Sequence, residues 1–204
     1  MRLYTYFRSS AAFRVRIALN LKELTYEPQV VHLPKGQHRE PAYGAVNPQA
    51  LVPTLELDDG RRLAQSMAII EYLEELHPRP PLLPEDPMAR ARVRSLSQLV
   101  ACEIHPLNNL RTLQYLRKQL GQNEDQVGVW YRHWIAEGLA KLEAELAGAG
   151  ETGRYCHGDS PTMADCCLVP QVANAHAFDV DMAPYPRVLA VERRCLELDA
   201  FQPG

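Results

Sequence analysis

The chain has 204 residues, of which 46% are hydrophobic and 23% charged, and its formal net charge is -3. This length suits one large domain or two small ones, and the composition is that of an ordinary soluble globular protein. Its charge offers no excess of positive residues for nucleic acid, and no apolar run approaches the length of a signal peptide or membrane span. We therefore expect a cytoplasmic protein with neither nucleic-acid nor membrane partners.

Residues 1–21 predict a strand followed by a helix. Residues 3–7 alternate with period two, and apolar residues between 13 and 21 recur at helical spacing, which places Ser9 and Ser10 at the turn between them. The start of a helix presents unpaired N–H groups and the positive end of a dipole, so it favours an anion, and a serine hydroxyl adds a directed donor. The alternative is that one of the serines only caps the helix.

The next segments complete a small mixed sheet. Residues 26–33 predict a second strand, which makes a parallel βαβ unit with the first, and the turn at 58–60 predicts a hairpin. A helix follows Gln65 and Ser66, with Ser66 as its expected N-cap and an apolar stripe at positions 69, 70, 73 and 76. We interpret the glutamates at 71, 74 and 75 as its solvated face.

Val52 and Pro53 stand at the entry to the first strand of that hairpin. A proline there can form a cis bond, which leaves the preceding backbone groups exposed to pair with an extended ligand. The alternative is an ordinary proline on an edge strand.

Five prolines between residues 78 and 87 exclude a continuous helix and indicate a linker. We therefore expect an α/β domain at 1–77, a linker at 78–87 and an all-α domain at 88–204. Within the latter we expect helices over 88–105, 108–120, 127–146, 160–177 and 186–198, the fourth with a capping box of Thr162 and Asp165.

The five cysteines all lie in the second half, without C-x-x-C spacing, and predict reduced, mostly buried thiols. Cys156 adjoins His157, but no second pair lies at ligand spacing, so we expect no metal.

Several motifs in the chain together point to a known family: Arg8-Ser9-Ser10, Arg14-Val15-Arg16-Ile17-Ala18-Leu19, Asn47-Pro48, Val52-Pro53-Thr54-Leu55, Gln65-Ser66, Ala68 to Glu75 and Leu168 to Ala175. They resemble the zeta class of the soluble glutathione transferases, which includes maleylacetoacetate and maleylpyruvate isomerases. An α/β thioredoxin-like domain, a proline-rich linker and an all-helical domain resemble the same family. The resemblance covers essentially the whole chain.

The resemblance implies glutathione as cofactor and assigns residues to it. Ser9 would face the glutathione sulfur with Ser10 beside it, Val52 would pair its backbone with the cysteinyl part, and Gln65 and Ser66 would hold the γ-glutamyl carboxylate at a helix start. Further positions that contact glutathione or line the cleft in this family are His38, His105, Asn109 and Arg111.

Two positions depart from the family pattern. Ala11 stands where a cysteine usually follows the two serines, which should leave glutathione binding intact. His176-Ala177-Phe178 lacks the arginine that the pattern usually has after Asn174-Ala175, so His176 would be a shorter, partly charged substitute for holding a substrate carboxylate. We expect Arg8 to be the main cation for that carboxylate and, with Ser9 and Ser10, to act in catalysis.

By resemblance, the expected function is glutathione-dependent cis–trans isomerisation of a maleyl-type dicarboxylate, first of all maleylacetoacetate to fumarylacetoacetate in tyrosine and phenylalanine catabolism. Maleylpyruvate is an alternative substrate. A broader transferase or dehalogenase of small halogenated acids is another alternative, and so is a non-catalytic interaction module, although a module would not need Ser9, Val52-Pro53 and Gln65-Ser66 together. The family also implies a homodimer, for whose interface we expect Arg90, Arg92 and Arg94 as candidates.

Overall fold

A computed structural model describes residues 1–202 of the chain and divides it into two units. The first contains Met1–Leu82 together with the end of the chain from Asp199, and the second contains Leu83–Leu198. The sequence predicts that the last residues belong to the helical domain. In the structure a short helical turn, η4 (Asp199–Phe201), packs on α1 (Ser10–Leu21), because the fully buried Phe201 side chain belongs to that core.

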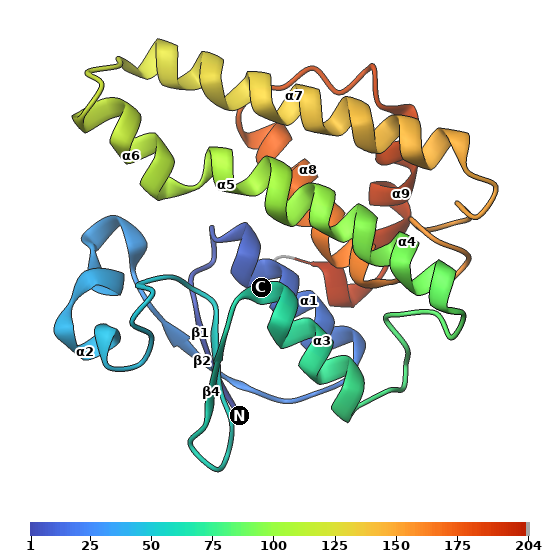
Figure 1. Cartoon of the computed structure of the whole chain (residues 1–204), viewed down its shortest axis with the longest axis horizontal. Helices are drawn as coiled ribbons and strands as arrows, with labels where there is room; N and C mark the ends of the chain where they lie inside the picture. The colour runs from blue at the N-terminus through green and yellow to red at the C-terminus, as the bar shows by residue number, and fades with distance from the viewer. Residues whose placement is uncertain (203–204) are drawn as a thin grey trace. The chain divides into compact units, whose positions relative to one another are not determined.

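The first unit is built on a four-stranded mixed sheet in the order β2-β1-β3-β4 (Figure 1). Strands β1 (Arg2–Thr5) and β2 (Glu27–Val30) are parallel and are joined through α1, which confirms the βαβ unit. Strand β3 (Thr54–Glu56) is antiparallel to both β1 and β4 (Arg62–Ala64), which confirms the hairpin.

Both faces of this sheet are covered. Helices α1 and α3 (Ser66–Leu76) pack together on the face of the fully buried pair Leu3 and Leu55 (Figure 1). On the opposite face, Tyr6 and Val52 form an apolar cluster with Tyr43, which lies on the short helix α2 (Pro41–Gly44). Between β2 and α2 the chain makes two further turns, η1 (Leu33–Lys35) and η2 (Gln37–Arg39).

The expectation for Glu74 is wrong. Its carboxylate is buried and accepts hydrogen bonds from Lys22 Nζ at 2.7 Å and from the backbone N–H of Leu82 at 2.9 Å. The Lys22 ammonium also donates to the carbonyls of His77 and Pro80 at 2.6 and 2.9 Å. These bonds tie the ends of α1 and α3 to the segment after residue 77.

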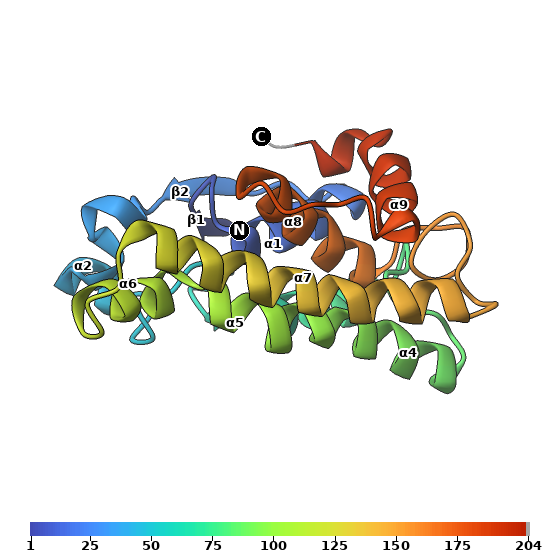
Figure 2. The ribbon, with the colours of Figure 1, turned by 90° about the horizontal axis from the view of Figure 1, so that it is seen from above.

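The second unit is all helical. It contains α4 (Pro87–Gln98), the π-helical segment η3 (Leu99–Ile104), α5 (His105–Asn108), α6 (Leu110–Lys118), α7 (Glu124–Gly148), α8 (Met163–Ala177) and α9 (Pro186–Leu196). Helix α8 packs against α4 and α9, and α7 packs against α9 and η3 (Figure 2). The sequence predicts one helix over 88–105, whereas the structure widens into a π turn before Pro106, which has no N–H to donate to the preceding turn.

The start of α8 confirms the predicted capping box. Asp165 Oδ2 accepts from the Thr162 backbone N–H at 2.7 Å, and Asp165 Oδ1 accepts from the Cys156 N–H at 2.8 Å. The buried Asp165 carboxylate therefore fixes both the helix start and the loop before it.

The cysteines are buried except for Cys102.

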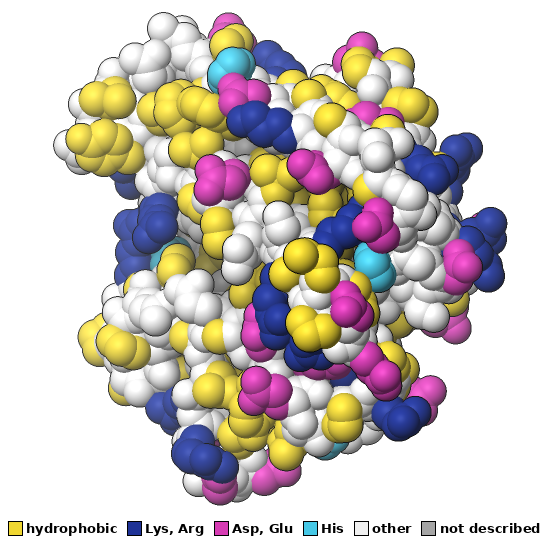
Figure 3. Space-filling view, turned by 45° about the vertical axis from the view of Figure 1, so that its right-hand side comes forward, with side chains coloured by type: hydrophobic (Ala, Val, Ile, Leu, Met, Phe, Trp, Pro, Cys, Tyr) yellow, Lys and Arg dark blue, Asp and Glu magenta, His cyan; other side chains and the backbone are white. Residues whose placement is uncertain are grey.

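Two of the arginines that were expected at the surface donate hydrogen bonds within the helical unit. Arg92 donates to the Cys156 carbonyl at 2.9 Å and to Thr152 Oγ1 at 2.9 Å, and Arg90 donates to the Pro84 carbonyl at 3.1 Å. On the face drawn in Figure 3, basic and acidic side chains are interspersed. Within residues 1–202, no helix combines the length and apolarity that crossing a lipid bilayer requires.

Candidate active site

The N-terminus of α1 is capped by Ser9. Its Oγ accepts a hydrogen bond from the Ala12 N–H at 3.2 Å, and its backbone is extended, with φ -83° and ψ 110°. A hydroxyl that accepts through its oxygen keeps its own proton for donation, so capping and anion binding are compatible for one serine. Ser10 is the first helical residue and is buried. The structure thus fixes the Ser9 oxygen at the positive end of α1 with one donor available.

Arg8 precedes this cap and is exposed. Among residues 1–202 its guanidinium forms no hydrogen bond or ion pair, so its donors are available to an anion from solution.

The start of α3 differs from the prediction, because Gln65, not Ser66, is the N-cap. Gln65 has φ 71°, a strained region for a residue other than glycine, and such strain is found most often at functional sites. Its side chain forms no cap hydrogen bond, and the start of α3 presents the positive end of the helix dipole. The Gln65 side chain instead donates to Gln49 Oε1 at 2.6 Å.

Ser66 is buried and accepts from a residue that the sequence analysis missed. Arg14 Nη1 lies 3.4 Å from Ser66 Oγ, and the Arg14 side chain is only 2% exposed. A buried guanidinium beneath a helix N-terminus adds to its positive potential. Arg14 is visible in the sequence within the motif Arg14-Val15-Arg16, but helical periodicity does not reveal which residue its side chain contacts.

The Val52–Pro53 peptide bond is cis. Val52 is 8% exposed, yet within residues 1–202 neither its N–H nor its C=O forms a hydrogen bond. Buried backbone groups are nearly always paired. The unpaired Val52 N–H and C=O are therefore available to pair with the backbone of an extended ligand.

His38 lies on η2 and is buried. Burial, and secondarily the positive charge of Arg39, lower the pKa of His38 below its usual 6.5. Its Nδ1 has no hydrogen-bond partner among the described residues.

Three of the four predicted site residues in the helical unit lie at the junction of α5 and α6. Asn109 caps α6 by accepting from the Arg111 N–H at 3.1 Å, and its Nδ2 lies 3.4 Å from His105 Nε2. The Arg111 side chain is exposed. One cation and two polar side chains thus lie at one helix junction.

His176 lies at the end of α8, and its Nε2 is 3.3 Å from Glu192 Oε2 on α9. An anion that approached His176 would also approach the Glu192 carboxylate, which weakens its attraction.

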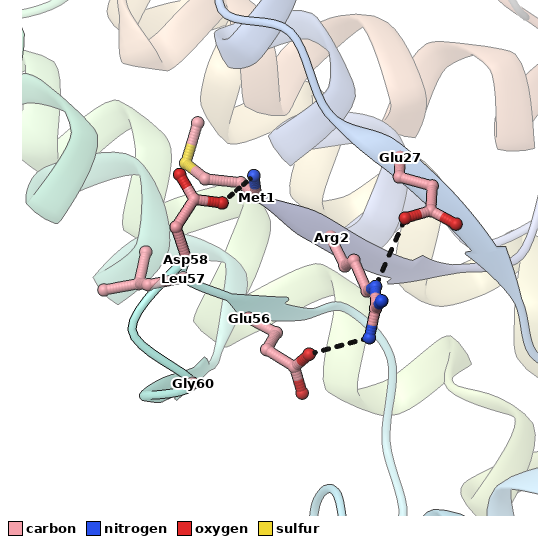
Figure 4. A pocket seen from close by; sticks show the side chains of 7 residues that line it. All are labelled: Met1, Arg2, Glu27, Glu56, Leu57, Asp58 and Gly60. Carbon is pink, nitrogen blue, oxygen red and sulfur yellow. Dashed lines mark hydrogen bonds and ion pairs between the residues drawn. The ribbon is translucent and has the colours of Figure 1, made fainter.

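A separate polar pocket of ≈ 290 Å³ lies at the end of the sheet that carries Met1 (Figure 4). The Met1 amine bonds Asp58 at 2.6 Å, and Arg2 lies between Glu27 and Glu56 at 3.2 and 3.3 Å. Its positive groups are already paired, and none of the predicted site residues lines it.

The fold and these helix N-termini identify the class. The N-terminal domain of glutathione S-transferase matches residues 8–76, and its C-terminal domain matches residues 134–194. The chain belongs to the glutathione S-transferase family.

Relatives within that family include proteins that are named as isomerases. A maleylpyruvate isomerase from Ralstonia sp is 52% identical over 203 residues, which cover 99% of this chain and 95% of the relative. The holo structure of a maleylpyruvate isomerase, a bacterial zeta-class glutathione transferase, superposes with a TM-score of 0.96 at 51% identity over 98% of this chain and 94% of that one. A maleylacetoacetate isomerase from Methylobacterium extorquens AM1 with bound malonate and glutathione gives 0.96 at 43% identity, with 98% and 94% coverage.

Proposed function

We propose that this chain is a glutathione-dependent cis–trans isomerase of maleyl-type dicarboxylates. The observation that carries the proposal is the N-terminus of α1, where Ser9 Oγ is held by the Ala12 N–H with its own proton available. Arg8, which has no partner among residues 1–202, precedes it. Relatives named as isomerases, which are about 50% identical over nearly the whole chain, support the proposal.

Glutathione, when bound, supplies a thiolate that adds to the cis double bond and leaves after rotation. The task of the protein is to ionise the thiol and to orient an anion. An ordinary thiol has a pKa of about 8.5, so a lowering by about two units needs roughly 2.7 kcal/mol. One hydroxyl donor and a helix N-terminus together are of this magnitude.

The other residues divide binding between them. The start of α3 at Gln65 and Ser66 holds the γ-glutamyl carboxylate, and the Val52 backbone pairs with the cysteinyl part. Arg8 holds a carboxylate of the acid substrate through a bidentate fork. His38, His105, Asn109 and Arg111 are proposed contacts of glutathione or of the cleft, and His176 has at most a minor role because Glu192 pairs with it.

Maleylacetoacetate and maleylpyruvate share a cis double bond conjugated to a carboxylate, and the proposed site binds this shared group. We expect maleylacetoacetate as substrate, in tyrosine and phenylalanine catabolism in the cytoplasm, with maleylpyruvate as the second candidate because of the Ralstonia relative.

The test is isomerisation of both acids with and without glutathione. We expect at least one acid to be isomerised with catalytic amounts of glutathione and neither acid to be isomerised without it. Failure with both acids, or equal rates without glutathione, would contradict it.

A further inference from the structure

The loop between α2 and β3 is held by buried hydrogen bonds that meet at one backbone oxygen. The Leu51 carbonyl accepts from the Tyr43 hydroxyl at 2.7 Å and from Asn47 Nδ2 at 2.9 Å. Tyr43 is 6% exposed and Asn47 3% exposed. Two short bonds from buried side chains are uncommon for one carbonyl in a loop, where solvent usually serves.

Thr54 closes this cluster into a ring. Its Oγ1 accepts from Asn47 Nδ2 at 3.0 Å and lies 3.1 Å from the Tyr43 hydroxyl oxygen. Since Tyr43 donates its only proton to Leu51, Thr54 donates its own proton to Tyr43. Every donor in the ring is used, so neither Tyr43 nor Asn47 can turn away from Leu51 without losing two bonds.

The Leu51 carbonyl and the Val52 N–H are opposite ends of one planar peptide unit. A contact that fixes the carbonyl oxygen also fixes the direction of that N–H, on the far side of the plane. The Val52 N–H forms no hydrogen bond within residues 1–202. The ring therefore presents an unpaired donor in a fixed direction.

We propose that Tyr43 and Asn47 are positioning residues that hold the Leu51–Val52 peptide so that the Val52 N–H is ready for the cysteinyl carbonyl of glutathione. This rests on the proposed binding of glutathione by Val52. Fixing the loop in advance removes an ordering cost from binding. Two donors on the carbonyl also polarise the peptide and make its N–H a stronger donor.

The experiment compares two buried tyrosines that each lose one hydroxyl. Tyr43→Phe removes a donor from Leu51, and Tyr185→Phe removes the hydroxyl that bonds the Ala136 carbonyl at 3.0 Å in the helical unit. Glutathione dissociation constants are measured by calorimetry without acid substrate. We expect Tyr43→Phe to weaken binding about three- to tenfold, the worth of one neutral hydrogen bond, and Tyr185→Phe to leave it unchanged although both lower the melting temperature.

Asn47→Asp is the second variant, because it keeps the shape of the side chain but cannot donate to Leu51. It too should weaken glutathione binding, and the Val52 amide resonance should shift in both site variants and remain unshifted in Tyr185→Phe. Wild-type affinity in Tyr43→Phe and Asn47→Asp, or equal losses in Tyr43→Phe and Tyr185→Phe, would overturn the proposal. Binding is measured apart from turnover, so a chain that binds glutathione but does not isomerise would contradict only the proposed function.

Discussion

At the scale of single residues, substitution of Ser9 should have two effects, one on stability and one on the bound thiol, which separate measurements distinguish. Ser9→Ala removes the cap of α1, which should cost about 1 kcal/mol of stability. It also removes the donor to the sulfur, so the pKa of the bound thiol should return toward its usual value of about 8.5 and turnover should fall far more than glutathione affinity. The thiolate absorbance of bound glutathione, titrated against pH, measures this.

Asn123→Ala is the matched control for Ser9→Ala, because Asn123 caps α7 through the Gln126 N–H at 2.9 Å. It should lower stability by a similar amount and leave the thiol unchanged. A bound-thiol pKa that is the same in Ser9→Ala and the wild type would remove Ser9 from its role.

Arg8 should carry most of the binding of the substrate carboxylate, because His176 is paired with Glu192. Arg8→Lys replaces a planar guanidinium, which can form two parallel hydrogen bonds, by a point charge. The Michaelis constant for the acid should rise roughly fivefold, which corresponds to the loss of about one hydrogen bond, and glutathione affinity should change little. Steady-state kinetics with each ligand varied in turn gives both values. Equal losses for glutathione and the acid would assign Arg8 to the cofactor or to the fold.

His38 gives a pH dependence with a definite sign. Burial and Arg39 lower its pKa in the folded chain, so folding favours the neutral imidazole. Its contribution to stability is complete above the unfolded pKa of about 6.5 and is lost as the pH falls below that value through the folded pKa. His38→Gln should flatten this part of the stability curve.

A nearby glutathione carboxylate would favour the charged imidazole. Saturating glutathione should therefore raise the pKa of His38, as measured by proton NMR. An unmoved titration would place His38 away from the bound tripeptide.

At the scale of the elements, Lys22 and Glu74 connect α1, α3 and the linker. Removing one member of a buried pair leaves the other charge uncompensated, so Lys22→Met should lower the free energy of unfolding by about 3–5 kcal/mol. The control is Lys141→Met, which breaks an exposed pair of the same 2.7 Å length and should cost at most about 0.5 kcal/mol. Urea denaturation compares them. Similar small losses would show that the buried bonds do not hold this junction.

The sequence predicts most elements because their signals are local. Each signal spans only a few residues of the chain. Examples are the period-two alternation of residues 3–7, the helical spacing after Ser10 and the capping box of Thr162 and Asp165. Glu74 was misread because its partner, Lys22, is 52 positions away and no periodicity connects them. Gln65 was not recognised as the N-cap because a positive φ in a residue other than glycine has no sequence signature.

The residues of the candidate site also fall into those that local sequence predicts and those that depend on distant contacts. Ser9 was predictable because the strand-to-helix change places it at a helix start. The contacts of Arg14 with Ser66 and of Tyr43 with Leu51 depend on how α1, α2 and the loop before β3 fold on the sheet, so they became visible only in the structure.

At the scale of the whole molecule, we expect a homodimer whose interface joins the first domain of one subunit to the helical domain of the other, as the family implies. Arg90 and Arg92 are engaged by their own chain, so they should contribute less than the sequence suggested. Light scattering at micromolar concentration should return twice the 23.1 kDa of one chain. A mass of 23.1 kDa would contradict this.

The fate of glutathione during turnover of the maleyl acids tests the proposed isomerisation most directly. An isomerase returns glutathione, so we expect many molecules of trans acid for each glutathione added and full recovery of the free thiol by mass spectrometry. Glutathione consumed one for one, with a stable conjugate as the product, would contradict isomerisation and identify a transferase instead.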